Sequence, residues 1–135
     1  MTCPFCEPKQ RVLKENERAY VLLSSPRKVE GHTLVIPKRH VENPLDIISE
    51  EVVDVFELIK FVQSRVIGTL GEGCTIKQNY FPFIPDDKFK VRHMHYHVLP
   101  RKFADQLFHF GDNQEKKLFE ELSQEEHDRV AKLLE

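Results

Sequence analysis

One segment constrains the fold of this 135-residue chain more than any other: residues 93–98, with the sequence HMHYHV. Histidine alternates there with apolar or aromatic residues, and this two-residue period is typical of a β-strand with two different faces. We therefore expect a strand over residues 91–99, ended by Pro100, whose apolar side chains pack against a helix. The three imidazoles would form a row on the opposite, accessible face, with neighbouring rings about 6.6 Å apart.

Three explanations of this histidine row compete. A solvated polar face that happens to be rich in histidine is the least favoured, because three neighbouring rings repel one another when charged. A metal site suits histidine, although neighbours on one strand lie too far apart for all three rings to reach one ion comfortably. In phosphoryl chemistry, a neutral imidazole attacks phosphorus while its neighbours hydrogen-bond to the phosphate oxygens and the leaving group. The spacing leaves metal binding and phosphoryl chemistry open.

Further strand signals lie on both sides of the centre of the chain. We expect four more strands, over residues 11–15, 18–24, 32–36 and 74–80. The polar residues Asn16 and Glu17 suit a hairpin turn between the first two, and Pro37 ends the third. A proline-containing loop over residues 81–88 follows the fourth.

One long helix is expected in the centre of the chain. Ser49 is the predicted N-cap, Glu50 and Glu51 favour the positive end of the helix dipole, and Gly68 and Gly71 mark the C-terminal end. Apolar residues keep a 3.6-residue period through this segment: Val52, Val55, Phe56, Ile59, Val62 and Val66.

The C-terminal tail over residues 112–135 is also helix-prone, and Ser123 with Glu126 has the spacing of a capping box. Together these elements indicate an α+β fold, a mostly antiparallel sheet of about five strands with one long central helix and a C-terminal helical tail. No repeat, low-complexity stretch or linker interrupts the sequence, so we expect a single domain over residues 1–135.

Net charge and the lengths of the apolar runs limit the partners that this chain can bind. The net charge of −2 argues against a dominant duplex-DNA or membrane-surface role, whereas a small anionic ligand needs only a local cluster of donors. No apolar run reaches the roughly 20 residues that span a bilayer, and the N-terminus has no basic region followed by an apolar one. We therefore expect a cytoplasmic protein without a membrane or nucleic-acid partner.

Cys3 and Cys6 lie in the sequence CPFC and are the strongest metal signal. Two thiolates at this spacing can chelate one zinc ion from a tight turn, and seven histidines are available for the two remaining ligands. A redox dithiol is the alternative, but a thioredoxin-like site would need a helix close after Cys6, and none is expected. The pattern therefore favours zinc. Cys74 lies far away and is expected to be a small buried side chain.

Three motifs in one order give the chain a resemblance to a known family. HMHYHV, followed by Leu99-Pro100-Arg101, is similar to the alternating pattern that names the histidine triad (HIT) family. The sequence GHTLVIPKRH at residues 31–40 resembles the second signature of that family, and CPFC resembles the N-terminal knuckle of its zinc-bearing members. The resemblance implies a HIT-like fold for residues 1–101, with residues 102–135 as a tail outside it.

The resemblance also implies two separate jobs for the histidines. His95 would attack the α-phosphorus of a nucleotide and form a nucleotidyl-histidine intermediate. His97 would contact the phosphate and help the leaving group depart, and His32 would be a fourth active-site histidine beside them. A structural zinc ion would be held by Cys3, Cys6, His40 and His93. Without the family pattern, His40 would be taken as an ordinary surface histidine.

The segment that leads into the triad departs from the family pattern. Typical members carry Gly-Gln-Ser/Thr-Val, whose glutamine and hydroxyl contact phosphates, whereas residues 88–92 are KFKVR here, after a loop two or three residues longer. Lys88 or Lys90 could supply a cationic donor instead, which would favour a more highly charged phosphate chain. The resemblance implies three further substrate contacts: the amide of Asn79 for phosphate or ribose, and Leu34 and Ile36 beside the nucleoside.

The sequence therefore predicts a nucleotide-phosphate hydrolase that works through a nucleotidyl-histidine intermediate. It would release a nucleoside monophosphate, with a purine base, from a phosphoramidate or a dinucleoside polyphosphate. Two alternatives stay open: a nucleotide-binding regulatory module with little turnover, and a nucleotidyltransferase or phosphorylase that passes the nucleotide to another acceptor. The resemblance also implies a homodimer with the central helix region at the interface.

Overall fold

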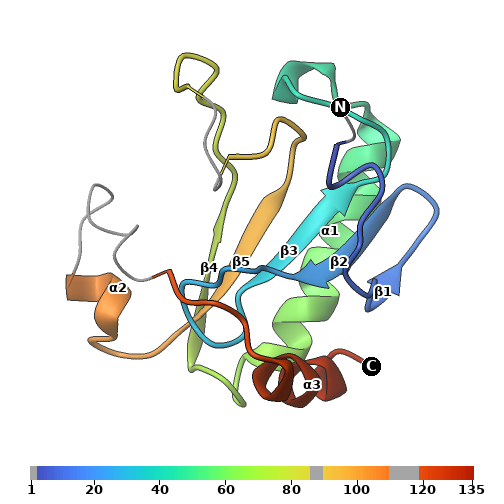
Figure 1. Ribbon diagram of the computed structural model, residues 1–135. Coiled ribbons are helices and arrows are strands. Elements are labelled where there is room, and N and C mark those ends of the chain that lie inside the picture. Colours follow the sequence, from blue (N-terminus) through green and yellow to red (C-terminus); the bar gives the residue numbers. More distant parts are fainter. Residues whose placement is uncertain (1–2, 86–89, 110–118) are drawn as a thin grey trace.

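The computed structural model describes residues 3–85, 90–109 and 119–135. Its centre is a five-stranded sheet in which all neighbouring strands are antiparallel. The strands are β1 (Lys14–Glu15), β2 (Ala19–Leu23), β3 (Thr33–Pro37), β4 (Gly73–Lys77) and β5 (Tyr96–Arg101). Their order across the sheet is β1-β2-β3-β5-β4, so β5 lies between β3 and β4 (Figure 1).

The sequence pattern predicts Pro37 and Pro100 just after the ends of two strands, but both prolines are strand residues. Pro37 is the last residue of β3, and Pro100 is the penultimate residue of β5. A strand tolerates proline where the missing N–H has no ladder partner to lose. Both prolines lie beyond the β3–β5 ladder, which runs from the Thr33–Val98 pair to the Val35–Tyr96 pair. Each strand can therefore continue through its proline while paired on the other side.

Helix α1 (Ser49–Val66) covers one face of the sheet, as Figure 1 shows. Its first turn differs from the prediction, because the N-cap is Ile48 and Ser49 is already helical. The N–H of Ile48 donates to the carboxylate of Glu51 at 3.1 Å. This bond satisfies one of the donors that a helix start leaves open, so a serine cap is not needed.

The core lies between α1 and the sheet and explains which helix positions are apolar. The buried apolar residues of α1 are Val55, Leu58, Ile59, Val62 and Val66. Two residues of the predicted apolar period lie outside this core, since Val52 and Phe56 are 38% and 43% exposed. They extend the apolar periodicity onto the outer side of the helix, so the sequence pattern alone could not separate core from surface.

The opposite face of the sheet carries a second apolar cluster, which we call the front cluster: Phe5, Tyr20, Leu22, Leu34 and Ile36. The N-terminal segment crosses this face, on the side of the sheet away from α1 (Figure 1). The hydroxyl of Tyr20 donates to the carbonyl of Phe5 and fastens that segment to β2. Both faces of the sheet are therefore buried over β2 and β3.

The C-terminal tail contributes α2 (Gln106–His109) and α3 (Gln124–Leu133), and a short 3-10 helix (Pro44–Asp46) precedes α1. The predicted cap of α3 is confirmed, since the side chain of Ser123 accepts from the N–H of Glu126 at 3.1 Å. The helix is shorter than the predicted segment 112–135, of which residues 112–118 lie outside the described residues. The predicted α+β class is confirmed. Among the described helices, none has the length and hydropathy that crossing a membrane demands.

Candidate active site and metal centre

The predicted row of histidines along one strand is wrong. β5 begins one residue before His97, so His93 and His95 lie in an irregular segment ahead of the strand. The N–H of Met94 donates to the carbonyl of Val41 at 2.6 Å and ties this segment to the loop after β3. The rings consequently meet different surroundings: His93 is buried, while His95 and His97 are partly accessible.

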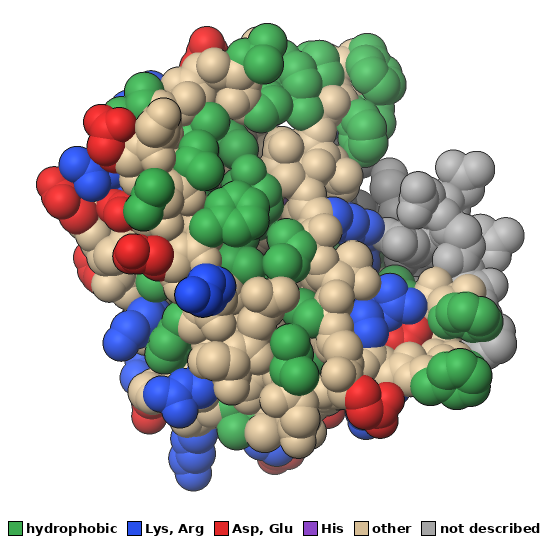
Figure 2. Space-filling model, turned by 180° about the vertical axis from the view of Figure 1, so that it is seen from behind, with side chains coloured by type: hydrophobic (Ala, Val, Ile, Leu, Met, Phe, Trp, Pro, Cys, Tyr) green, Lys and Arg blue, Asp and Glu red, His purple; other side chains and the backbone are tan. Residues whose placement is uncertain are grey.

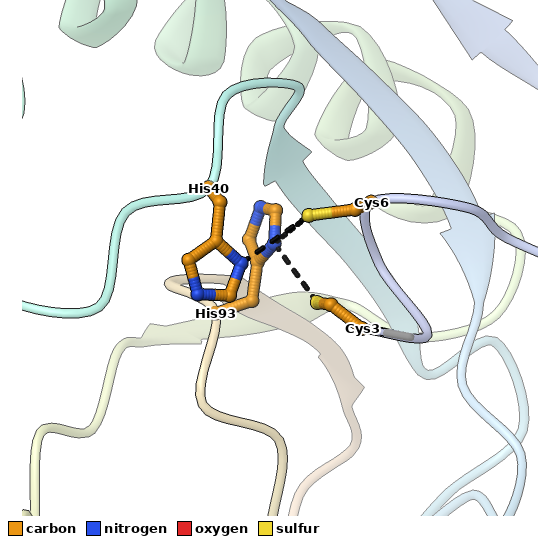
Figure 3. Close-up of side chains that lie close together, drawn as sticks. All are labelled: Cys3, Cys6, His40 and His93. Carbon is orange, nitrogen blue, oxygen red and sulfur yellow. Dashed lines mark hydrogen bonds between the residues drawn. The ribbon is translucent and has the colours of Figure 1, made fainter. Parts of the chain in front are cut away.

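The four predicted metal ligands meet in space although they come from three distant parts of the sequence (Figure 3). We call residues 3–6 the knuckle. The Nδ1 atom of His93 lies 3.3 Å from the sulfur of Cys3 and 3.5 Å from that of Cys6, and the Nδ1 atom of His40 lies 3.2 Å from Cys6. All four candidate ligand atoms lie within 4.8 Å of one another. A tetrahedral zinc ion needs sulfur–nitrogen separations of about 3.6 Å, so these donors fit it.

The outer nitrogens of both imidazoles have acceptors that fix the tautomer. Nε2 of His93 lies 2.7 Å from the carbonyl of Pro37, and a carbonyl can only accept, so this nitrogen carries the proton. Nε2 of His40 lies 3.2 Å from the carboxylate of Glu42, which selects the same tautomer. Each Nδ1 therefore presents its lone pair to the thiols. A metal-bound histidine usually has such an acceptor beside its outer nitrogen.

His95 is held in the opposite tautomeric form. Its Nδ1 lies 2.7 Å from the carbonyl of His93, so Nδ1 carries the proton and Nε2 keeps its lone pair. The ring of Phe5, in the knuckle, packs edge-on against it with 5.0 Å between centroids, and against His93 at 5.9 Å. His95 is thus oriented by a backbone bond and an aromatic contact, and its free lone pair is a nucleophile.

A chain of hydrogen bonds fixes the other two histidines. The backbone N–H of Lys28 donates to Nδ1 of His32 at 3.0 Å, so Nε2 of His32 carries the proton. That nitrogen lies 2.8 Å from Nδ1 of His97 and donates to it. Nε2 of His97 must then carry a proton in the neutral ring. We call this chain the relay; it ends in an N–H donor beside His95, whose ring centroid is 4.9 Å from that of His97.

Burial keeps these imidazoles neutral. Desolvation lowers the pKa of His32 to about 3, with smaller contributions from the positive charges of Lys28 and Lys77. The pKa of His97 is lowered for the same main reason, followed by the charges of His32 and His95. Burial also lowers the pKa of His95, while the bond to the His93 carbonyl opposes the shift. A neutral imidazole is the form that attacks as a nucleophile or donates a single N–H.

The two predicted nucleoside contacts, Leu34 and Ile36, are both buried residues of β3. Leu34 is 5% exposed and pairs in register with His97, so it borders the histidines directly. Ile36 has no exposed surface and lies beneath the other members of the front cluster. Contact of a nucleoside with either residue stays a prediction.

The predicted polar contacts fall on the segment between β4 and the histidines. Asn79 is exposed, just beyond the end of β4. The ammonium group of Lys90 donates to the carbonyl of Phe81 at 2.7 Å and to that of Ile84, so it ties this loop together. Lys88 lies outside the described residues. The structure therefore gives Lys90 an internal role and leaves contact with a substrate untested for Asn79 and Lys90.

Three contributors to the site were missed in the sequence. Phe5 was taken only as part of a rigid knuckle, although it contacts both His93 and His95. Lys28 acts through its backbone N–H, which no side-chain pattern reveals. Lys77 pairs in register with His97, and a lysine inside a predicted strand was a signal that could have been followed.

Comparison with known proteins agrees with this geometry. The family model described as the HIT domain matches residues 6–104. A HIT-like protein of Borreliella burgdorferi is 34% identical over 134 residues, covering 90% of this chain and 93% of its own. A bis(5'-adenosyl)-triphosphatase of Dictyostelium discoideum is 28% identical, covering 93% and 79%. The crystal structure of a zinc-bound histidine triad family protein from Mycobacterium smegmatis has a TM-score of 0.71 and 25% identity, covering 99% and 94%.

Proposed function

The chain belongs to the HIT family, and on that premise we propose that it is a nucleotide-phosphate hydrolase with His95 as its nucleophile. The observation that carries the proposal is the bond from Nδ1 of His95 to the carbonyl of His93, which leaves Nε2 unprotonated. The similarity to a relative named as a bis(5'-adenosyl)-triphosphatase supports nucleotide chemistry of this kind.

In the proposed reaction, Nε2 of His95 attacks the α-phosphorus of the nucleotide. A phosphorus–nitrogen bond forms, the bond to the leaving oxygen or nitrogen breaks, and the electron pair of that bond goes to the leaving atom. The ring becomes positively charged while Nδ1 still donates to the His93 carbonyl, which stabilises that charge. Water then attacks the phosphorus, the phosphorus–nitrogen bond breaks with its electron pair returning to Nε2, and the nucleoside monophosphate leaves as the water loses a proton to solvent.

The relay would serve the leaving group. The Nε2–H of His97 is the donor at its end, so it can hydrogen-bond to the leaving atom and stabilise the negative charge that builds there as the bond breaks. His32 donates its Nε2–H to Nδ1 of His97 and so keeps the proton of His97 on Nε2, while the leaving group takes its proton from solvent. The nucleoside would lie beside Leu34, which pairs with His97 and gives it an apolar neighbour next to the phosphate position.

We further propose that Cys3, Cys6, His40 and His93 hold a structural zinc ion. The similarity to a zinc-bound family member and the fit of the donor distances support this. The ion would supply a closed, four-ligand crosslink and no direct chemistry. Its value for catalysis would lie in His93, whose ring is a ligand and whose carbonyl orients His95.

A second copy of the chain is the proposed partner. The outer side of α1 exposes Val52, Val53 and Phe56, and Ile76 is exposed on β4, an edge strand of the sheet. Figure 2 shows apolar side chains gathered on the side of the molecule seen from behind. An exposed apolar surface beside an open strand edge favours association between identical chains. Sedimentation of the Phe56→Glu variant would test this, with a monomer expected.

Mass spectrometry after incubation with substrates tests the mechanism directly. Wild-type protein mixed with a dinucleoside polyphosphate or a nucleoside phosphoramidate should yield the monophosphate and a nucleotide adduct on His95. The His95→Ala variant should lose at least about 10³-fold in kcat and all adduct, with its zinc content unchanged. His127→Ala is the matched control, because this histidine lies on α3 beside Asp128. Full activity in His95→Ala, or an adduct on another residue, would refute the assignment.

A further inference from the structure

Four residues in register form a row across the front of the sheet, on the side away from α1. Leu22 on β2 pairs with Leu34 on β3, Leu34 pairs with His97 on β5, and His97 pairs with Lys77 on β4. Directly paired residues point to the same face of a sheet, and neighbouring strands lie about 4.8 Å apart. The row therefore passes from apolar side chains through a reactive imidazole to an ammonium group.

The surroundings of the relay are electropositive. The lowered pKa values of His32 and His97 include contributions from the positive charges of Lys28 and Lys77, after the larger effect of burial. Within the described part of the chain, no carboxylate contributes to the shift of either ring. The ammonium group of Lys28 also lies 5.3 Å from the centre of the Phe119 ring, on the side of the C-terminal tail. Lys77 is thus the cation placed in the row itself.

We propose that Lys77 is a specificity-determining residue that binds the phosphate next to the broken bond in the leaving group. This inference rests on the proposed function and narrows it. The α-phosphate would lie beside His97, the nucleoside on the Leu34 side of it, and the first phosphate of the leaving group beside Lys77. The preferred substrate is therefore a nucleotide whose leaving group is itself a phosphate chain.

The chemistry of the leaving group decides between the two substrate classes of the proposed function. When a dinucleoside polyphosphate is cleaved, negative charge builds on the bridging oxygen and on its attached phosphate, and an ammonium group stabilises both. When a phosphoramidate is cleaved, the leaving atom is an amine nitrogen that takes up a proton. A lysine beside it offers no comparable gain and repels a protonated amine.

Lys77 is a further candidate beside the cations that the sequence suggested, Lys88 or Lys90. Lys88 lies outside the described residues, and the ammonium group of Lys90 donates to two carbonyls of its own loop. Lys77 is fixed instead by a strand, opposite the histidine that serves the leaving group. Its register places it on the side of His97 away from Leu34, where a phosphate chain can extend without crossing the apolar surface.

The test compares two substrates in three variants. Lys77→Gln should lower kcat/KM for a diadenosine polyphosphate by roughly 10- to 100-fold, as expected for loss of a charge-assisted hydrogen bond. For an adenosine phosphoramidate of an alkylamine, the change should stay within about twofold. Lys77→Arg keeps the charge and should retain the preference. Lys60→Gln, at an exposed position of α1, makes the same charge change away from the sheet front and should alter neither substrate.

Equal losses for both substrates in Lys77→Gln, or an equally large loss in Lys77→Arg, would overturn the inference. The His95 adduct keeps this failure separate from failure of the proposed function, because the adduct should form in all three variants. If no substrate is turned over, the affinities for two ligands test the role of Lys77 instead. In the His95→Ala background, Lys77→Gln should weaken the affinity for the diadenosine polyphosphate about tenfold or more and leave that for AMP unchanged. Unchanged affinity for both ligands would reject the role of Lys77.

Discussion

The two ends of the histidine cluster are held in place by different means. At one end, His40 and His93 lie outside the strands and converge on two thiols of the N-terminal knuckle. At the other, His97 lies within β5 and His32 directly precedes β3, and a backbone N–H begins the hydrogen bonds that link them. The metal end depends on a crosslink between distant segments, whereas the relay end depends on the sheet itself.

His95 stands between these two ends and depends on both. The carbonyl of His93 sets its tautomer, and its ring lies 4.9 Å from that of His97. This difference predicts that changes at the metal end mainly lower the stability of the fold, whereas changes in the relay mainly lower catalytic activity. Loss of the metal end should loosen the fold and disturb His95 indirectly, while changes in the relay should affect the leaving group and spare the fold.

Breaking the metal end should have the largest effect on stability. Cys3→Ser and Cys6→Ser, or removal of zinc by a chelator, should lower the free energy of unfolding by roughly several kcal/mol, because metal binding energy is folding energy. Thermal unfolding with parallel zinc analysis measures this, and the midpoint should fall by roughly 10 °C or more. Cys74→Ser is the control, since Cys74 lies on β4 outside the cluster. An equal fall of the unfolding midpoint in Cys74→Ser would mean that the metal end has no special role in stability.

Breaking the relay should reduce turnover and leave zinc in place. His32→Gln interrupts the hydrogen bond to His97, and kcat should fall roughly 100-fold for substrates with a basic leaving group. A nucleotide ester of p-nitrophenol should be much less affected, because its leaving group is a stable anion that gains little from a hydrogen bond. Stopped-flow or steady-state assays on both substrates make the comparison. Similar losses on the two would mean that the relay does not act on the leaving group.

Much of the metal end could be predicted from the sequence, because it depends on residue types at short spacings. Cys3 and Cys6 were recognised from CPFC, and His40 and His93 from their place in the family signatures, and the structure brings all four side chains together. Their role as zinc ligands stays a prediction. The alternation of the strand also placed Val98 correctly, since it joins the core beneath α1.

The relay end was harder to predict because it depends on pairings between distant segments. The start of β5 was misplaced because the N–H of Met94 bonds to the carbonyl of Val41, a loop residue distant in the sequence. The alternation of residue types along a strand does not reveal such a partner. Lys77 acquires its position only from the β4–β5 register. Lys28 contributes an N–H, which every residue except proline possesses. Residue type could identify these histidines, but only the tertiary structure assigns their tautomers.

In the C-terminal tail, too, a feature set by neighbouring residues was easier to predict than contacts with distant ones. The capping residue Ser123 was predicted from its spacing to Glu126, and this is confirmed. Packing of the tail as a terminal helix was expected, and Val130, Ala131 and Leu134 join the core beside α1, although the spacing of the cap does not show which residues they contact. They support our proposal that residues 102–135 fold with the rest of the chain as one domain, since their removal would expose buried apolar surface.

Acid should destabilise the relay end in a predictable direction, and this is the smallest of the expected effects. The pKa of His32 is about 3 in the folded protein, mainly because of burial, against about 6.5 in an unfolded chain. Between these values the unfolded state binds a proton that the folded state does not, so stability is full above about pH 6.5 and decreases as the pH falls towards 3. The slope contributed by one such histidine is about 1 kcal/mol per pH unit.

Comparing wild type with His32→Gln isolates this contribution, because acid also protonates the thiols of the metal end equally in both proteins. Denaturant unfolding of the zinc-loaded proteins between pH 6.5 and 4.5 should show a steeper loss in wild type. Parallel curves would mean that His32 is protonated in the folded protein, and the tautomers derived for the relay would then be wrong. A steeper wild-type curve would show instead that the sheet keeps His32 neutral, which is the form that accepts from the Lys28 N–H and donates to His97, so that the Nε2–H of His97 faces the leaving group.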